Sequence, residues 1–414
     1  MATISGGNSG TAIAFNAGSN DQNGTAKALS DAITAALSNG TIARQGQLAP
    51  AGTPSLTVLS APGAYAFAPG QNSVVIATGG ASTVFGSGAL NEQIIGDSGD
   101  TTLSLRGGSG SVVLGDGADF VTASATGTTG FNLRTGNGND TVLALGGNNT
   151  VATGTGKNLI GLGAGQNTVS LSGNDTVFGN SGAGGSETVF GGAGSSLIFP
   201  LSSNLYFVGS TGSATVIGGT GSETVFAGSG GGLFGGGAAG NNRLTNAQGG
   251  SATLYGAAQG DLLYATGKGL TTMVAGTGNE TLDGSTSSVG NVFYGSNGPS
   301  SSTGASMAGG SGNDTIYAGT NSTINGGAGA DQIIFQAGRA SGTIQVQGFN
   351  PAEKASFQGY AGTAFTTGIV GAGTTGSVGT TVQVNGVSST QIVLGNGTTI
   401  QFVGVTSLNG SSFN

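Results

Sequence analysis

The reactive chemistry open to this chain depends on its carboxylates, because its 414 residues include no cysteine and no histidine. Without thiols and imidazoles, a thiolate metal site, the usual kinds of zinc site and a Ser–His or Cys–His catalytic arrangement are excluded. The chain has 17 Asp and Glu against 9 Lys and Arg, which gives a formal net charge of −8. That charge argues against a nucleic acid or an anionic membrane surface as the partner.

Two pairs of carboxylates are close enough in sequence to suggest acid–base catalysis, Asp97 with Asp100 and Asp116 with Asp119. Two carboxylates held a few ångströms apart can share such work. Both pairs lie in glycine-rich segments, however, where aspartate is a common turn residue. We therefore interpret all four as turn residues and expect no enzymatic activity.

A regular spacing of apolar residues must position these carboxylates. Within residues 141–234 an apolar side chain returns every nine residues in two series, with glycine at every repeat. Because glycine costs a helix about 1 kcal/mol relative to alanine, a helix of this period is excluded. A short strand followed by a glycine turn fits instead, and two such units would form one coil of a flattened solenoid. The positions are Val142, Val151, Ile160, Val169, Val189, Ile198, Phe207, Val216, Val225 and Phe234.

Two stretches, residues 309–317 and 326–334, match a nine-residue pattern at every fixed position: G-G-x-G-x-D-x-U-x, where U is apolar. A third, residues 135–143, lacks only the first glycine. These segments resemble the repeats of RTX (hemolysin-type calcium-binding) proteins, which form parallel β-rolls. The resemblance implies an all-β fold, a parallel β-roll or β-solenoid of nonapeptide repeats, over residues 72–335.

The same resemblance implies a bound metal ion. In that family the aspartate at the sixth position and nearby backbone carbonyls bind Ca²⁺ between turns stacked on the same side. Calcium takes six to eight oxygen ligands, so one carboxylate alone makes a poor site. Asp314 and Asp331 lie about one coil apart in complete motifs, which implies one calcium site there, or a few in the chain; Asp140 is a weaker candidate, because it would stack on Asn158. The predicted metal-site residues are Asp314, Asp331, Gly310, Gly312, Gly327, Gly329 and Asp140.

Asparagine replaces the acid in three successive repeats, at Asn149, Asn158 and Asn167. Stacked asparagine amides can hydrogen-bond along a ladder and replace an ion with a neutral contact. This departure from the family pattern argues against the hypothesis that folding of the whole chain depends on calcium.

Residues 1–71 are predicted to form an N-terminal segment with one helix at about 25–39. Apolar residues recur at helical spacing from Ala26 to Leu37, and Gly40 stands where a C-cap belongs. We interpret this helix as a cap over the first coil, because an open solenoid end exposes its core and an unpaired strand edge. A partner-binding helix is the alternative. The sequence shows no secretory signal peptide and no run of transmembrane length.

Residues 336–414 are predicted to form a C-terminal β cap, with a β-hairpin over residues 390–403. Residues 348–354 resemble the segment that closes the calcium roll of type I-secreted proteins, and the end of the chain resembles their uncleaved secretion region. This resemblance implies export by type I secretion machinery, to the outside or the cell surface of a Gram-negative bacterium.

Three hypotheses for function remain. The first is a secreted, non-enzymatic structural protein that assembles with itself into filaments or a biofilm-like matrix, because only 6% of the residues are charged and no catalytic arrangement is visible. The second is a surface-layer or adhesin module that binds a cell surface or polymer, although the aromatic residues are scattered along the sequence. The third is an ice-binding solenoid, although leucine and tyrosine interrupt the recurring threonines. We expect a homo-oligomer or filament, without nucleic acid and without membrane insertion.

Overall fold

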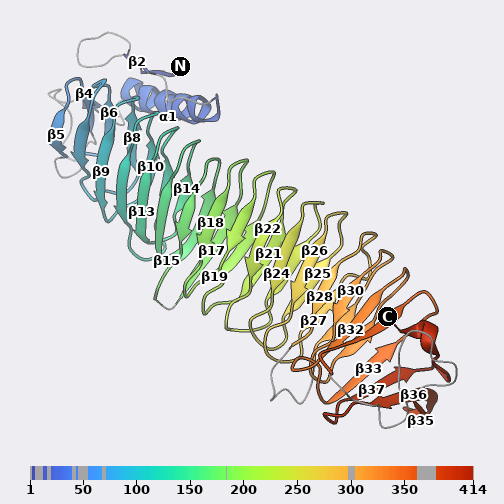
Figure 1. Ribbon diagram of the computed structural model, residues 1–414. Helices are drawn as coiled ribbons and strands as arrows, with labels where there is room; N and C mark the ends of the chain where they lie inside the picture. The colour runs from blue at the N-terminus through green and yellow to red at the C-terminus, as the bar shows by residue number, and fades with distance from the viewer. Residues whose placement is uncertain are drawn as a thin grey trace. The chain divides into compact units, whose positions relative to one another are not determined.

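The computed structural model describes residues 2–4, 13–15, 20–39, 43–44, 55–67, 71–182, 184–296, 304–360 and 379–413. The chain has two compact units, Met1–Tyr206 (unit 1) and Phe207–Asn414 (unit 2). In each unit, short parallel strands form two sheets, and the chain passes from one sheet to the other at successive turns (Figure 1). Each unit is therefore a parallel β-solenoid, as the nine-residue spacing and the motif resemblance predicted.

Unit 1 contains a helix-side sheet, named for its neighbour α1 (Asn20–Ser38), and a second sheet. β15 (Leu159–Ser170) takes part in both sheets, and β1 (Ala2–Ile4) and β2 (Ile13–Phe15) form a separate antiparallel pair. The other strands of the helix-side sheet are β3 (Ala43–Arg44), β4 (Ser55–Leu59), β6 (Ser73–Ile76), β8 (Glu92–Gly96), β10 (Gly110–Val113), β12 (Phe131–Arg134), β14 (Thr150–Ala152) and β17 (Gly185–Phe190). Those of the second sheet are β5 (Gly63–Ala66), β7 (Ser82–Phe85), β9 (Thr101–Arg106), β11 (Phe120–Ser124), β13 (Thr141–Gly146), β16 (Thr176–Phe178) and β18 (Ser196–Phe199).

Unit 2 contains a hairpin-side sheet, named for the hairpin of β36 and β37, and its own second sheet; β19 (Asn204–Val208) includes the boundary between the units. The strands of the hairpin-side sheet are β21 (Glu223–Ala227), β23 (Arg243–Asn246), β25 (Leu262–Ala265), β27 (Thr281–Asp283), β29 (Ser306–Ala308), β31 (Thr323–Asn325), β33 (Thr343–Gln347), β35 (Thr380–Val384), β36 (Val387–Val393) and β37 (Thr399–Val403). Those of the second sheet are β20 (Ala214–Val216), β22 (Gly232–Gly235), β24 (Ala252–Tyr255), β26 (Thr271–Val274), β28 (Val292–Tyr294), β30 (Thr315–Tyr317), β32 (Gln332–Gln336) and β34 (Lys354–Gln358). A short 3-10 helix, η1 (Gly410–Ser412), follows β37.

The register of the strands stacks the recurring apolar residues into a core. Val142 lies beside Val121 on one side and Ile160 on the other, and all three side chains are completely buried. Because neighbouring strands are about 4.8 Å apart, such a column leaves no room for water between coils. Glycine is required where turns stack just as closely: Gly136 has a φ of 82°, and a Cβ on it would lie 1.8 Å from the carbonyl oxygen of Gly115.

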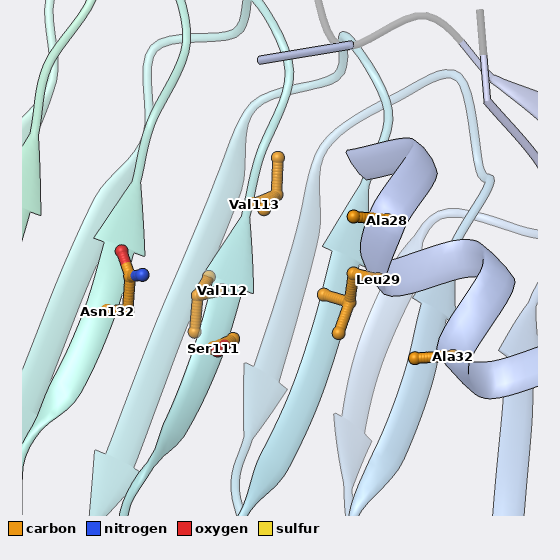
Figure 2. Close-up of a pocket in the computed structure, with 7 residues that line it drawn as sticks. All are labelled: Ala28, Leu29, Ala32, Ser111, Val112, Val113 and Asn132. Carbon is orange, nitrogen blue, oxygen red and sulfur yellow. The ribbon is translucent and has the colours of Figure 1, made fainter. Parts of the chain in front are cut away.

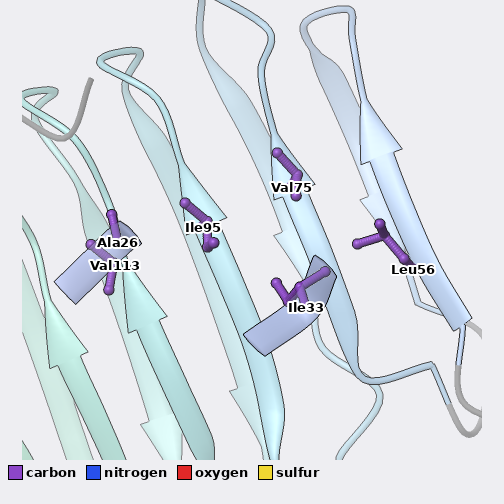
Figure 3. Packing of buried hydrophobic residues seen from close by; sticks show 6 residues of the cluster. All are labelled: Ala26, Ile33, Leu56, Val75, Ile95 and Val113. Atoms are coloured by element: carbon purple, nitrogen blue, oxygen red, sulfur yellow. The ribbon is translucent and has the colours of Figure 1, made fainter. Parts of the chain in front are cut away.

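α1 begins five residues earlier than predicted and ends at Ser38, while Gly40 lies outside the described residues. Figure 3 shows its packing: Ala26 and Ile33 are buried against an apolar cluster on four neighbouring strands, β4, β6, β8 and β10. The sheet residues of this cluster are Leu56, Val75, Ile95 and Val113.

The helix covers the outward face of these strands, whereas the sequence interpretation placed it over the open end of the first coil. Ile95 and Val113 pair in register, and each directly follows an inward-facing residue, so both point away from the solenoid core. On the next two strands, the outward residues in register with Val113 are Arg134 and Ala152. Neither is a large apolar side chain that a helix would have to cover. A groove of about 260 Å³ lies between the middle of α1 and strands β10 and β12 (Figure 2), lined by Ala28, Leu29, Ala32, Ser111, Val112, Val113 and Asn132.

The parallel ladder reaches farther toward the N-terminus than residue 72. β4 pairs with β6 in parallel, and β5 pairs with β7. Residues 1–71 are predicted from the sequence to lie outside the solenoid, but β4 and β5 lie within that range and contain no proline. At the other end the predicted hairpin forms: β36 and β37 are antiparallel, β37 also pairs in parallel with β33, and β35 adds an antiparallel outer strand.

Replacing Ile33 with alanine should release α1 from the sheet. The substitution removes a completely buried side chain, and such changes cost about 2–5 kcal/mol. Because repeat proteins open locally, we expect faster amide hydrogen exchange in β6, β8 and β10 and unchanged exchange in β13. Lys27→Ala is the control, since it removes only an exposed ion pair with Asp31. Equal protection in the two variants would contradict this docking.

Candidate metal centre

The carboxylates at the sixth repeat position form hydrogen-bonded columns where the turns stack. In the second sheet of unit 2, Asp314 Oδ1 accepts the N–H of Asn291 at 2.6 Å, and Asp331 Oδ1 accepts the N–H of Asp314 at 2.8 Å. Glu353 follows in the column, because the next residue, Lys354, pairs with Gln332. The structure thus places the predicted pair Asp314 and Asp331 in neighbouring coils.

The predicted glycines shape the two turns that carry this pair. The N–H of Gly310 donates to Asp314 Oδ2 at 2.8 Å, and the carbonyl of Gly310 accepts the N–H of Ala328 at 2.8 Å. Gly327 and Gly329 have φ values of 92° and 127°, a backbone conformation that residues with a side chain rarely adopt. A Cβ on Gly329 would also lie 2.3 Å from the carbonyl oxygen of Gly312. These residues therefore fix the backbone around the carboxylates.

Two buried carboxylate oxygens in this column have no hydrogen-bond donor, Asp331 Oδ2 and Glu353 Oε1. Both face the same small space, because a Cβ built on Gly326 would lie 2.7 Å from the first and 2.1 Å from the second. Asp314 differs, since Gly310 already donates to its Oδ2. The oxygens left for a cation thus belong to Asp331 and Glu353, one coil beyond the predicted pair.

The charges of this pair favour a cation. Burial raises the pKa of Asp331, and burial together with the negative charge of Asp331 raises the pKa of Glu353, although the Asn350 N–H bond at 2.8 Å opposes the shift. A proton shared between the two carboxyls, or a bound cation, would satisfy both oxygens. No three acidic side chains converge within the described ranges, so an ion at this place would take its other ligands from backbone carbonyls and water. Within that limit the oxygen-only donor set fits calcium.

Asp140 lies in a second column, at the edge of the second sheet of unit 1. Its Oδ1 accepts the N–H of Asp119 at 2.9 Å, and its own N–H donates to Asn158 Oδ1 at 2.9 Å. Asp119 Oδ1 in turn accepts the N–H of Thr101 at 2.8 Å. The Oδ2 atoms of Asp119 and Asp140 are buried without a donor. Asp140 thus has an acidic neighbour in addition to the predicted Asn158.

Burial changes the proton affinity of this second pair. Burial raises the pKa of Asp119 to about 8, and the negative charge of Asp140 adds to this rise. The hydrogen bond from the Thr101 N–H acts in the opposite direction and lowers the pKa. Burial also raises the pKa of Asp140 to about 6. Asp116, which the sequence paired with Asp119, is instead exposed and accepts the N–H of Asn137 at 3.1 Å. That sequence pair therefore does not share one site, because a turn directs its two members differently.

Asn149 and Asn167 form the predicted neutral contact, whereas Asn158 lies in a different column, between two aspartates. The N–H and the side-chain amide of Asn149 donate to Asn167 Oδ1 at 3.1 and 3.2 Å, at the edge of the helix-side sheet. Asn158 belongs to the other edge, where its amide donates to Asp175 Oδ1 at 2.7 Å. The division arises because successive nine-residue units belong to opposite sheets.

Glutamates at the acid position behave differently from aspartates. Glu92 Oε1 accepts the N–H groups of Ser87 and Gly88 in its own turn at 2.8 and 3.1 Å. The extra methylene lets Glu92 fold back on its own turn, whereas Asp314 bonds its own turn with Oδ2 and the neighbouring coil with Oδ1. Sequence reasoning missed Glu353 and also Asp261, whose Oδ1 accepts from the backbone and amide of Asn242 at 2.9 and 2.8 Å. Glu353 lies 22 residues after Asp331 in the sequence, and that longer separation concealed the stacking.

Comparison with known families agrees with these turns. A model of four copies of the RTX calcium-binding nonapeptide repeat matches residues 134–169, 181–199 and 308–339. These three segments of the chain are RTX-type repeats. The matched RTX segments contain Asp140, Asp314 and Asp331, whereas Asp119 and Glu353 lie outside them. Calcium is the cofactor of such repeats, which agrees with the oxygen-only donor set. No curated protein and no solved structure gives a significant match to the chain.

Removing the acidic pair of unit 2 should remove calcium-induced stabilisation there. With Asp331→Asn and Glu353→Gln combined, isothermal titration with CaCl₂ should lose a binding event, because the ion loses both side-chain ligands. In the unchanged protein, calcium at 100 times its Kd should raise the free energy of unfolding by about 2.7 kcal/mol. Asp283→Asn is the control, since Asp283 accepts a local bond from Ser285 at 2.9 Å. Full calcium binding by the double variant would place the ion elsewhere.

Without calcium, unit 1 should lose stability as the pH rises. Because the folded-state pKa values of Asp119 (about 8) and Asp140 (about 6) exceed the usual value of 3.8, the folded state binds more protons than the unfolded state between pH 4 and 8. Stability is therefore fully present at low pH and is lost as the pH passes these values, by on the order of 2 kcal/mol for Asp119 between pH 6 and 9. Tm measured across this range in chelator should fall, and should fall less for Asp119→Asn. A Tm independent of pH would show that these carboxyls are already ionised at pH 6.

Proposed function

We propose that this chain is a secreted structural protein that joins further copies of itself through the outermost strands of its sheets, to form filaments or a matrix. RTX repeats are typical of secreted proteins, and a β-solenoid of such repeats is typical of proteins without enzymatic activity. In the described ranges, neither α1 nor η1 has the length and apolar character of a membrane-spanning helix. The proposal adds self-association and export by type I machinery to these coarser statements.

The observation that carries the proposal is the outer strand β35 (Thr380–Val384) of unit 2. Among the described residues it pairs only with β36, which leaves its other edge open. Thr380, Thr381 and Gln383 are exposed, and the strand holds neither a charge nor a proline. Natural proteins protect open edges with charges, prolines or covering segments, because an unprotected edge pairs with another chain. An edge that lacks these devices suits strand addition.

β5 (Gly63–Ala66) is the corresponding strand in the second sheet of unit 1. Within the described residues its only ladder partner is β7, and Gly63, Ala64 and Ala66 are exposed. The strand also has no charged residue, although Pro62 directly precedes it. Among the described residues, β5 and β35 thus supply two different open edges, and a head-to-tail assembly needs two different joining surfaces.

A surface-layer or adhesin role is the second candidate, and one group of side chains favours it. The guanidinium of Arg243 lies 5.9 Å from the ring centre of Phe226 and 5.3 Å from that of Tyr264, on neighbouring strands of the hairpin-side sheet. These rings are scattered in sequence but lie close together because the coils stack. Such aromatic and arginine side chains are enriched where proteins bind partners.

Charging the open edge of unit 2 should block assembly. In Thr381→Lys combined with Gln383→Lys, two like charges on β35 would oppose a strand arriving at that edge. Negative-stain electron microscopy should then show a marked fall in filament length. Thr126→Lys with Thr128→Lys is the matched control, because both threonines are exposed in a turn away from either open edge. Unchanged filaments in the β35 variant would exclude this strand as the joint, and a wild-type protein that never assembles would refute the proposal itself.

A further inference from the structure

One outward surface of unit 1 collects large apolar side chains without a described covering segment. It lies on the second sheet, across the neighbouring strands β11, β13, β15, β16 and β18. The strand register arranges the outward residues in two rows. The first row is Phe120, Thr141, Leu159, Thr176 and Leu197, and the second is Thr122, Leu143, Gly161, Phe178 and Phe199. None of these ten positions carries a charge.

We call the six large residues of these rows the apolar face: Phe120, Leu143, Leu159, Phe178, Leu197 and Phe199. The rings of Phe178 and Phe199 stack with centres 5.1 Å apart and planes 7° from parallel. Leu143 reaches over Gly161, because a Cβ there would lie 3.0 Å from Leu143 Cδ2. Side chains from separate coils thus join into one continuous surface. Its members nevertheless remain accessible, with Phe120 at 42%, Leu159 at 40% and Phe178 at 39% exposure.

The helix-side sheet shows how the same unit treats a comparable surface. There the outward residues Val75, Ile95 and Val113 are covered by α1 and are at most 1% exposed. The apolar face has no such cover within the described residues, and its exposed area is on the order of 400 Å², from about 150–250 Å² per aromatic side chain. A patch of this size on a soluble protein usually marks an interaction site.

We infer that the apolar face binds the apolar face of a second copy of this chain, side by side. An uncharged, sheet-built surface offers nothing to a charged partner, whereas two such faces can pack at the usual sheet-to-sheet distance of about 10 Å. The first row alternates large residues with threonine, so a two-fold related copy can place its large side chains against the smaller ones.

The area of the face decides what kind of contact this is. A stable dimer usually buries about 800 Å² on each partner, roughly twice what the apolar face offers. One such contact is therefore weak, but copies aligned by end-to-end joining would repeat it and gain from multivalency. This multivalent contact rests on the proposed end-to-end assembly. End-to-end joining would determine the length of a filament, whereas the apolar face would determine whether filaments pair side by side.

The test is a charge on the face, introduced as Leu159→Glu with Phe178→Glu. Both side chains are partly exposed, so the fold should survive, which circular dichroism and calcium binding would verify. In electron microscopy, wild-type filaments should lie in pairs or bundles, and the variant should form single filaments of unchanged length. Leu90→Glu with Phe190→Glu is the matched control, because these residues are 63% and 42% exposed but lie outside the apolar face. Variant filaments that still pair, or wild-type filaments that never pair, would overturn the inference.

Sedimentation equilibrium separates this inference from the proposed function. If neither the wild-type protein nor any variant forms filaments, the proposed end-to-end assembly is refuted. A weak side-by-side dimer can still be measured by sedimentation at high protein concentration. The inference then expects the face variant to raise the dimer dissociation constant about tenfold or more, while the control does not. A wild-type protein that stays monomeric, or equal constants in both variants, would overturn it.

Discussion

Several coils of this protein depend on a neighbouring coil for the partner of one backbone N–H group. That group belongs to the residue just before a strand, where the turn has ended and the next ladder bond has not begun. An oxygen from the equivalent side chain of the following coil accepts it, from Asn158 for Asp140 and from Asp331 for Asp314. Because a buried N–H left unpaired costs about 1–3 kcal/mol, a side chain with an oxygen at the right reach stabilises the coil at this position.

The residue chosen for that position then sets the charge of the coil. Asparagine supplies the same bond without a charge, as Asn167 does for Asn149. Aspartate supplies it with one oxygen; the other is bonded in its own turn at Asp314, whereas at Asp119 and Asp331 it is buried without a donor. Glutamate is long enough to bond within its own turn instead. The calcium chemistry of the repeats is therefore confined to particular coils, while coils with stacked amides hold together through neutral contacts.

The outward faces of the sheets are free of these demands. Backbone pairing and the inward apolar column are satisfied whatever side chain points outward, so those positions can vary from unit to unit. Unit 1 uses them to seat α1 over Ile95 and Val113 and to present, on the other sheet, an apolar face that no described segment covers. Unit 2 places Arg243 over two aromatic rings. The differences in side-chain chemistry between the units thus reside on surfaces that the fold does not require.

The sequence by itself determined the solenoid, its alternation of sheets and the turns that hold Asp314 and Asp331, because a nine-residue apolar spacing with glycine turns admits few other folds. Only the tertiary structure decided which carboxylates meet. Glu353 reaches Asp331 after a longer connection, and Asp119 meets Asp140 rather than Asp116, since stacking depends on ladder register and not on distance along the chain. The position of α1 on a side face, and the joining of separated aromatic residues into one surface, have the same origin. They follow from which coils are adjacent, and the spacing within one repeat carries no information about what lies outside it.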